Sequence, residues 1–157
     1  MKVPFVKMHG NGNDFVIVDN TKSNFNYNSK MIKKLSNRRL GIGCDQFIVL
    51  SKSSYYDVLM RIYNADGNEA EMCGNGIRCL SKYLYDSEIT NKSTNLLVET
   101  KAGLISTRYK SNNDILVKMG RPKLKPDLIP TLFTIGKSGL AESQVNLDGK
   151  DYNLYSV

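Results

Sequence analysis

The chain has 157 residues, which suits one globular domain or one domain followed by the beginning of a second. Hydrophobic residues make up 41% of the chain, but apolar runs such as residues 15–18 are too short to cross a bilayer, so we expect no membrane association. The N-terminal residues do not have the pattern of a secretory signal, so we expect a cytoplasmic location. The net charge of +7 would suit a nucleic-acid-binding protein, but the basic groups at residues 33–39 and 121–125 are short, which favours a solvated basic surface and no nucleic-acid partner.

The first predicted elements are two extended stretches, residues 3–8 and 15–18, separated by the Gly- and Asn-rich segment 9–14. Gly and Asn tolerate positive φ angles, so this segment is typical of a turn. Farther along, Ser29 is a candidate N-cap for a helix that ends near residues 37–38 and carries apolar side chains at helical spacing.

A second Gly-rich loop at residues 41–46 leads into the apolar run 47–50, which is a predicted buried strand. Residues 58–63 alternate in the manner of another strand, and the Asn-Ala-Asp-Gly sequence at 64–67 is a strong turn signal after it. A hairpin or a strand-loop-strand unit is expected here.

The most apolar predicted helix follows the Cys-Gly-Asn-Gly sequence at residues 73–76. Ile77, Leu80 and Leu84 share one face of this helix. The apolar stripe indicates a helix enclosed by a sheet rather than one lying on a surface.

Three extended segments with short connections come next, at residues 96–100, 104–109 and 115–119. Short connections favour antiparallel pairing. Three prolines within residues 122–130 then mark a boundary, so we expect a first domain at 1–119 and, at 120–157, a connector with the incomplete start of a second domain. Two or three weak strands are expected after residue 132, and the chain ends inside one of them, as an interrupted chain would.

Cys73 is the first candidate for chemistry. It directly precedes Gly74-Asn75-Gly76 at the expected N-terminus of a helix, where free N–H groups and the helix dipole stabilise an anion. A thiol there becomes a better thiolate, or the N–H groups could hold a substrate carboxylate beside the sulfur. A buried structural cysteine is the alternative, and position alone does not decide between them.

The other cysteines and the single histidine are weaker candidates. Cys79 falls near the apolar face of the helix and Cys44 follows a Gly-Ile-Gly turn, so both are interpreted as structural. His9 could be a general base, although a histidine beside a turn is more often a hydrogen-bonded structural group. With three cysteines, one histidine and no CxxC or HxxxH pair, the sequence predicts reduced thiols and no metal site.

Four amide side chains lie in Gly-rich or turn segments between apolar runs: Asn13, Gln46, Asn64 and Asn75. Such residues are normally turn formers, because they bond to nearby backbone groups. They could also converge to bind the ammonium and carboxylate groups of an amino acid without adding charge. Spacing alone favours neither interpretation.

Three segments resemble the N-terminal signature sequences of the diaminopimelate epimerase family: Lys-Met-His-Gly-Asn-Gly-Asn-Asp-Phe at residues 7–15, Gly-Ile-Gly-Cys-Asp-Gln at 41–46, and the sequence that runs from Asn64 to Cys79. Their presence in this order makes the match specific, and a weaker similarity at residues 120–122 extends it over essentially the whole chain. The family interconverts LL- and meso-diaminopimelate, a small-molecule substrate on the route to lysine and peptidoglycan, without pyridoxal phosphate or another cofactor.

The resemblance implies an α+β fold with two similar lobes, each a mixed β-barrel wrapped around a central helix. The substrate lies between the lobes, where a cysteine thiolate from one lobe removes the α-proton and a thiol from the other returns one to the opposite face. The resemblance gives Cys73 the acid/base role of the N-terminal lobe. It assigns substrate binding to Asn13, Gln46, Asn64, Gly74 and Asn75. It also implies a homodimer for the complete enzyme.

The family's second cysteine motif and the strand that should complete the first lobe are absent from these 157 residues, and Cys44 stands where the family more often has an apolar residue or alanine. We therefore expect a fragment that is inactive alone, because one cysteine cannot serve both faces of the α-carbon. A truncated, non-catalytic amino-acid-binding remnant is the main alternative. A basic nucleic-acid-binding domain and an enzyme of the proline racemase type rank lower.

Overall fold

The computed structural model describes residues 2–23, 25–90, 95–110 and 114–157. The chain divides into two compact units, Met1–Met119 and Gly120–Val157, which are described separately.

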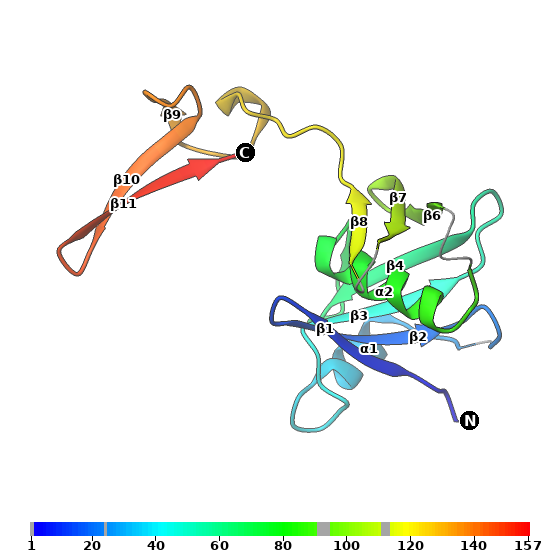
Figure 1. Ribbon diagram of the computed structural model, residues 1–157. Coiled ribbons are helices and arrows are strands. Elements are labelled where there is room, and N and C mark those ends of the chain that lie inside the picture. The colour runs from blue at the N-terminus through cyan, green and yellow to red at the C-terminus, as the bar shows by residue number, and fades with distance from the viewer. Residues whose placement is uncertain (1, 24, 91–94, 111–113) are drawn as a thin grey trace. The chain divides into compact units, whose positions relative to one another are not determined.

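The first unit is a mixed sheet curled around one helix (Figure 1). The strand order is β1-β2-β3-β4-β6-β7-β8, with the short β5 paired to β4; β2–β3 and β4–β6 are parallel pairs and the other pairs are antiparallel. The strands are β1 Val6–Gly10, β2 Asn13–Asp19, β3 Gln46–Ser51, β4 Val58–Asn64, β5 Glu69–Ala70, β6 Asn95–Thr100, β7 Gly103–Tyr109 and β8 Ile115–Lys118. The helices are α1 Ser29–Ser36 and α2 Gly74–Asp86.

The helix α2 contacts both edge strands, β1 and β8, as well as β2, β3 and β7, so the sheet wraps it as a half-barrel. This arrangement confirms the predicted α+β class with a central helix. Neither described α-helix of this unit has the length and hydrophobicity that a membrane span requires.

The first hairpin is tighter than the sequence predicts. The turn consists only of Asn11 and Gly12, with φ angles of 53° and 81°, and Gly10 pairs directly with Asn13. Positive φ at both central residues gives the turn the twist that an antiparallel hairpin needs, and Asn-Gly is the dipeptide that adopts it most readily. Strand pairing therefore replaces most of the loop expected at residues 9–14.

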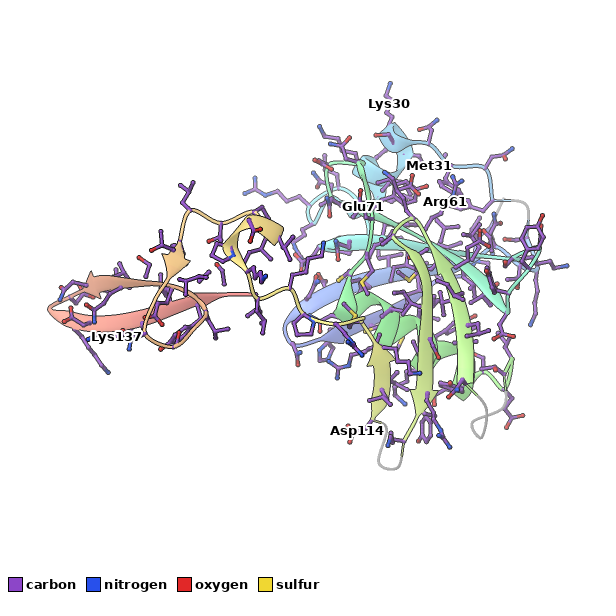
Figure 2. All side chains as sticks on the ribbon, turned by 90° about the horizontal axis from the view of Figure 1, so that it is seen from above. Lys30, Met31, Arg61, Glu71, Asp114 and Lys137 are labelled. Carbon is purple, nitrogen blue, oxygen red and sulfur yellow. The ribbon has the colours of Figure 1, made fainter. Side chains whose placement is uncertain are left out.

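The prediction that Ser29 caps the first helix is wrong. Asn28 is the N-cap: its backbone is extended, and its side-chain oxygen accepts a hydrogen bond from the Met31 N–H at 2.9 Å. Asn and Ser are comparable N-caps, so capping propensity could not choose between these two neighbours. The helix packs Ile32 against the sheet, whereas Lys30 points away from it (Figure 2).

Two hydrophobic clusters occupy the two faces of β2 and β3. Phe15 and Ile17 face α2, and the alternating Val16 and Val18 belong to the cluster on the α1 side. Successive strand residues point to opposite faces, so a strand that is covered on both faces has a continuous run of apolar residues in its sequence. The predicted strands at residues 47–50 and 58–63, the hairpin after them, and the antiparallel β6–β7–β8 meander are all confirmed.

In the first turn of α2, Gly76 is buried against side chains of the sheet. A Cβ atom placed there would lie 3.0 Å from Ile62 Cδ1, 3.2 Å from Phe15 Cε1 and 3.4 Å from Cys73 Cβ. No side chain fits without moving these neighbours, so glycine sets how closely the helix approaches the strands.

The second unit is a three-stranded antiparallel sheet in the order β11-β10-β9. Its elements are the 3-10 helix η2 Pro126–Leu128 and the strands β9 Thr134–Ile135, β10 Ala141–Leu147 and β11 Lys150–Ser156. Asp148 and Gly149, with φ angles of 51° and 76°, form the β10–β11 turn. The two or three strands predicted after residue 132 are thus three.

The Gly76 contact gives a testable prediction. Gly76→Ala is expected to lower the free energy of unfolding by about 1–3 kcal/mol, because the added methyl group overpacks the contact with Ile62 and Phe15. Gly74→Ala is the matched control, since a Cβ there meets only Met119 Cε at 3.8 Å. Urea denaturation should show the control unchanged or stabilised by up to about 1 kcal/mol, as for any helical Gly→Ala change. Equal stabilities for both variants would contradict the close approach.

Candidate active site

Cys73 is the N-cap of α2. Its backbone is extended, with φ −145° and ψ 117°, and its Sγ accepts a hydrogen bond from the Gly76 N–H at 3.4 Å. The first turn of the helix carries no acidic residue, so no carboxylate there opposes a negative charge on the sulfur. Free N–H groups and the positive end of the helix dipole favour an anion at this position. The half-buried thiol therefore lies at the positive end of the helix dipole, where a ligand can reach it.

Three of the predicted amides form a continuous row that ends at this sulfur. Asn13 Nδ2 lies 3.6 Å from Cys73 Sγ and 3.4 Å from Gln46 Oε1, and Gln46 Nε2 donates to Asn64 Oδ1 at 2.9 Å. The sheet brings them together because β2 and β3 begin where β4 ends, with Gln46 opposite Asn64 in the register. Asn64 is exposed, and Asn13, Gln46 and Cys73 are half-buried, so the row is open to a ligand.

The remaining predicted residues, Gly74 and Asn75, lie at the same helix end. Asn75 Oδ1 accepts from Asn11 Nδ2 at 3.2 Å and from Arg78 Nη1 at 3.5 Å. Both contacts use the amide oxygen, which turns the Asn75 NH₂ group away from the hairpin tip and from Arg78. The sequence analysis did not single out Asn11. The Asn-Gly dipeptide at residues 11–12, a typical hairpin turn, was the signal that could have pointed to it.

The other two thiols and the histidine lie elsewhere. Cys44 and Cys79 are buried, and burial raises the pKa of each thiol. Cys44 also contacts Ser36 Oγ at 3.5 Å. Their interpretation as core cysteines is confirmed. His9 lies exposed on β1, opposite Asp14 in the hairpin register. Within the described parts of the chain, no three His, Cys, Asp or Glu side chains come together as a metal site requires.

A charged cluster adjoins the amide row in the sequence, and sequence reasoning missed it. The Arg38 guanidinium binds both oxygens of Asp14, at 2.6 and 3.1 Å, and one oxygen of Asp45, at 2.8 Å. Lys7 Nζ adds a contact to Asp14 at 3.1 Å and donates to the Gly43 carbonyl oxygen at 2.6 Å. We call Arg38, Asp14 and Asp45 the charge clamp.

The charge clamp shifts the titration of its partly buried member. The Arg38 guanidinium, followed by hydrogen bonds from the Asp45 backbone and from Lys7, holds the pKa of Asp14 well below its usual range, although partial burial opposes the shift. Arg38 lies 24 residues from Asp14, so only the tertiary fold reveals the contact.

A sequence profile of the family described as "Diaminopimelate epimerase" matches residues 5–125. The chain belongs to the diaminopimelate epimerase family. The chain is 37% identical to a diaminopimelate epimerase of Leptospira biflexa serovar Patoc, an alignment that covers 100% of the chain and 57% of that protein. It is 49% identical to one from Carboxydothermus hydrogenoformans, over 80% of the chain and 47% of that protein. The chain therefore spans about half the length of the curated relatives it matches.

Solved structures of more distant proteins share the fold of this family member. A probable proline racemase from Agrobacterium radiobacter K84 matches with a TM-score of 0.57 and 14% identity, covering 74% of this chain and 41% of that one. A Bacillus anthracis protein of the PhzF family matches with a TM-score of 0.56 and 22% identity, over 74% and 40%. At these identities the similarity confirms the fold class alone.

The low pKa of Asp14 predicts a pH-dependent contribution to stability. An unfolded aspartate titrates near pH 4, so the stabilisation is present above that pH and is lost progressively as the pH falls below about 4 toward the folded value. Asp14→Asn is expected to lower the free energy of unfolding by about 1–2 kcal/mol at pH 7. The loss is no larger because Arg38 is largely exposed and solvent screens its ion pair with Asp14.

Urea denaturation at several pH values tests this, and the difference between Asp14→Asn and the unmodified chain should shrink below about pH 4. Asp86→Asn is the control, because it removes an exposed i,i+4 pair with Lys82 and should cost less than about 0.5 kcal/mol. A cost of Asp14→Asn that stays constant with pH would contradict the assignment.

Proposed function

We propose that this chain forms the part of a diaminopimelate epimerase that acts on one face of the substrate α-carbon, with Cys73 as its acid/base and no cofactor. The observation that supports this most directly is the position of the Cys73 sulfur at the N-terminus of α2, in contact with the first amide of the Asn13–Gln46–Asn64 row. Family membership supports the choice of substrate and reaction.

The proposed step is a proton transfer between carbon and sulfur. The Cys73 thiolate takes the α-proton, so the C–H bond breaks, an S–H bond forms, and the electron pair moves toward the α-carboxylate. The first-turn N–H groups at Gly74 and Asn75 hold that carboxylate and its developing charge. Asn13, Gln46 and Asn64 bind polar groups of the amino acid, since each amide offers both a donor and an acceptor.

Inversion also needs a proton donor on the opposite face. Cys44 and Cys79 are buried, so neither thiol can reach the opposite face of a substrate at Cys73. We propose that the second thiol lies outside these three cysteines, and that the 157-residue chain by itself does not invert diaminopimelate. The homodimer and the cytoplasmic location inferred from the sequence stay predictions.

The alternatives differ in what can be measured. A non-catalytic amino-acid-binding remnant would use the same amides but would leave the α-proton of the ligand in place. A nucleic-acid-binding domain would show affinity that falls steeply with salt, because phosphate contacts release counterions. The Asn-Ala-Asp-Gly and Met-Cys-Gly-Asn-Gly sequences at residues 64–67 and 72–76 favour diaminopimelate over the proline racemase type.

Substitution of the cysteines tests the role of Cys73. In any form of the protein that epimerises diaminopimelate, Cys73→Ala is expected to abolish inversion, measured as loss of the change in optical rotation. Cys79→Ala is the matched control and should keep turnover while lowering the free energy of unfolding by about 1 kcal/mol, a typical cost for a buried position. Normal epimerisation by Cys73→Ala would refute the proposal.

Alkylation tests substrate binding in the 157-residue chain itself. Iodoacetamide should modify Cys73 first, because the other two thiols are buried, and diaminopimelate should slow this modification. Mass spectrometry of the digested chain identifies the labelled cysteine. Valine is the control ligand, since it has one amino-acid head and no second one. Equal labelling of Cys73 with and without diaminopimelate would count against the proposed substrate.

A further inference from the structure

The charge clamp and the amide row occupy the same two strand starts but opposite faces of the sheet. Asp14 directly follows Asn13 at the start of β2, and Asp45 directly precedes Gln46 at the start of β3. Because neighbouring residues of a strand point to opposite faces, the two carboxylates face the α1 side while the two amides face α2.

We propose that Arg38 is a positioning residue for the substrate site. It binds the carboxylates of Asp14 and Asp45 on the α1 side of the sheet, and in this way it fixes the spacing of the Asn13 and Gln46 side chains on the α2 side, beside Cys73. This inference rests on the proposed function. Arg38 touches neither the sulfur nor the amides in any described contact, so it acts through the strands.

The backbone contacts of the charge clamp show how the effect reaches the amides. The Asp14 N–H donates to Asp45 Oδ2 at 3.1 Å, and the Asp45 N–H donates to Asp14 Oδ1 at 2.9 Å and to the Asp14 carbonyl oxygen at 3.1 Å. The two aspartates thus exchange bonds across the strand starts, which brings two negative charges together. Arg38 supplies the positive charge that contacts both carboxylates, whereas Lys7 contacts Asp14 alone. Loss of Arg38 would therefore leave their repulsion only partly offset and would separate the strand starts.

The amide row tolerates little separation. The Asn13–Gln46 distance of 3.4 Å and the Asn13–Cys73 distance of 3.6 Å already lie near the long end of hydrogen-bonding range for their atoms. A shift of about 1 Å would break both contacts, and misplacement of that size can cost about 100-fold in enzyme activity.

Arginine suits this role better than lysine. The guanidinium is a planar fork that binds Asp14 through two nitrogens while one of them also reaches Asp45. A lysine ammonium is a single point charge on a flexible stem, so it would neutralise the carboxylates without fixing their relative orientation. Lys7 already supplies such a point charge to Asp14, from β1.

The experiment compares Arg38→Met and Arg38→Lys with Arg61→Met in the 157-residue chain. Arg61 pairs with Glu69 at 3.9 Å on the same sheet, so its substitution removes an arginine and an ion pair away from the amide row. Three quantities are measured for each variant: the rate of Cys73 alkylation at fixed pH, the diaminopimelate concentration that halves this rate, and the urea midpoint of unfolding.

We expect Arg38→Met to raise the half-protecting diaminopimelate concentration at least about tenfold, and Arg38→Lys to fall between it and the unmodified chain. Alkylation without ligand should also slow about threefold, because Asn13 no longer donates to the sulfur. Arg61→Met should change both by less than about twofold. If Arg38→Met does not fold, Arg38→Lys, which keeps the charge, carries the comparison with the same direction expected.

Unchanged protection and an unchanged or faster alkylation rate in a folded Arg38 variant would overturn the positioning role. Equal losses in Arg38→Met and Arg61→Met would overturn it too, since they would show a general effect of removing an arginine. Failure of the proposed function looks different: diaminopimelate would then not protect the unmodified chain. In that case the ligand-free alkylation rate alone decides whether Arg38 positions Asn13 at the sulfur.

Discussion

The close approach of α2 to the sheet at Gly76 is the contact on which the core and the candidate site both depend. Gly76 lies between Phe15 and Ile62, so the helix start is set by two buried side chains from β2 and β4. The residue that caps this helix start is Cys73. The same approach therefore excludes water from the core and places the thiol beside Asn13. A cysteine on a loop would lack both the rigid support and the free N–H groups of the first turn.

The sheet end that carries the site is held from both sides. On the α2 side, the amide row links β2, β3 and β4 and ends at the helix cap; on the α1 side, the charge clamp ties the starts of β2 and β3 to the segment that follows α1. Charged groups are thus kept behind the strands, while neutral amides face the thiol. Neutral amides can bind the ammonium and the carboxylate of one amino acid alike, and they leave the local field to the helix dipole.

Local signals in the sequence identified most elements of the first unit, because strands buried on both faces and an amphipathic central helix leave strong patterns. Cys73 could be placed at a helix start because the Gly-Asn-Gly sequence after it precedes an apolar stripe. The cap of α1 could not be chosen, since Asn28 and Ser29 have similar capping propensities. Arg38 could not be connected to Asp14 and Asp45, because parallel pairing of β2 with β3 joins segments separated by an entire helix.

The three thiols differ in burial, and this difference bears on the proposed proton transfer. Burial raises the pKa of Cys44 and Cys79. The Cys73 sulfur accepts a hydrogen bond from the Gly76 N–H at the N-terminus of α2 and lies beside the Asn13 amide. A single acid/base at a fixed position can remove a proton and return it only to the same face of the α-carbon. On the proposed mechanism, stereochemical inversion therefore requires a second group, and another structural element has to set its position.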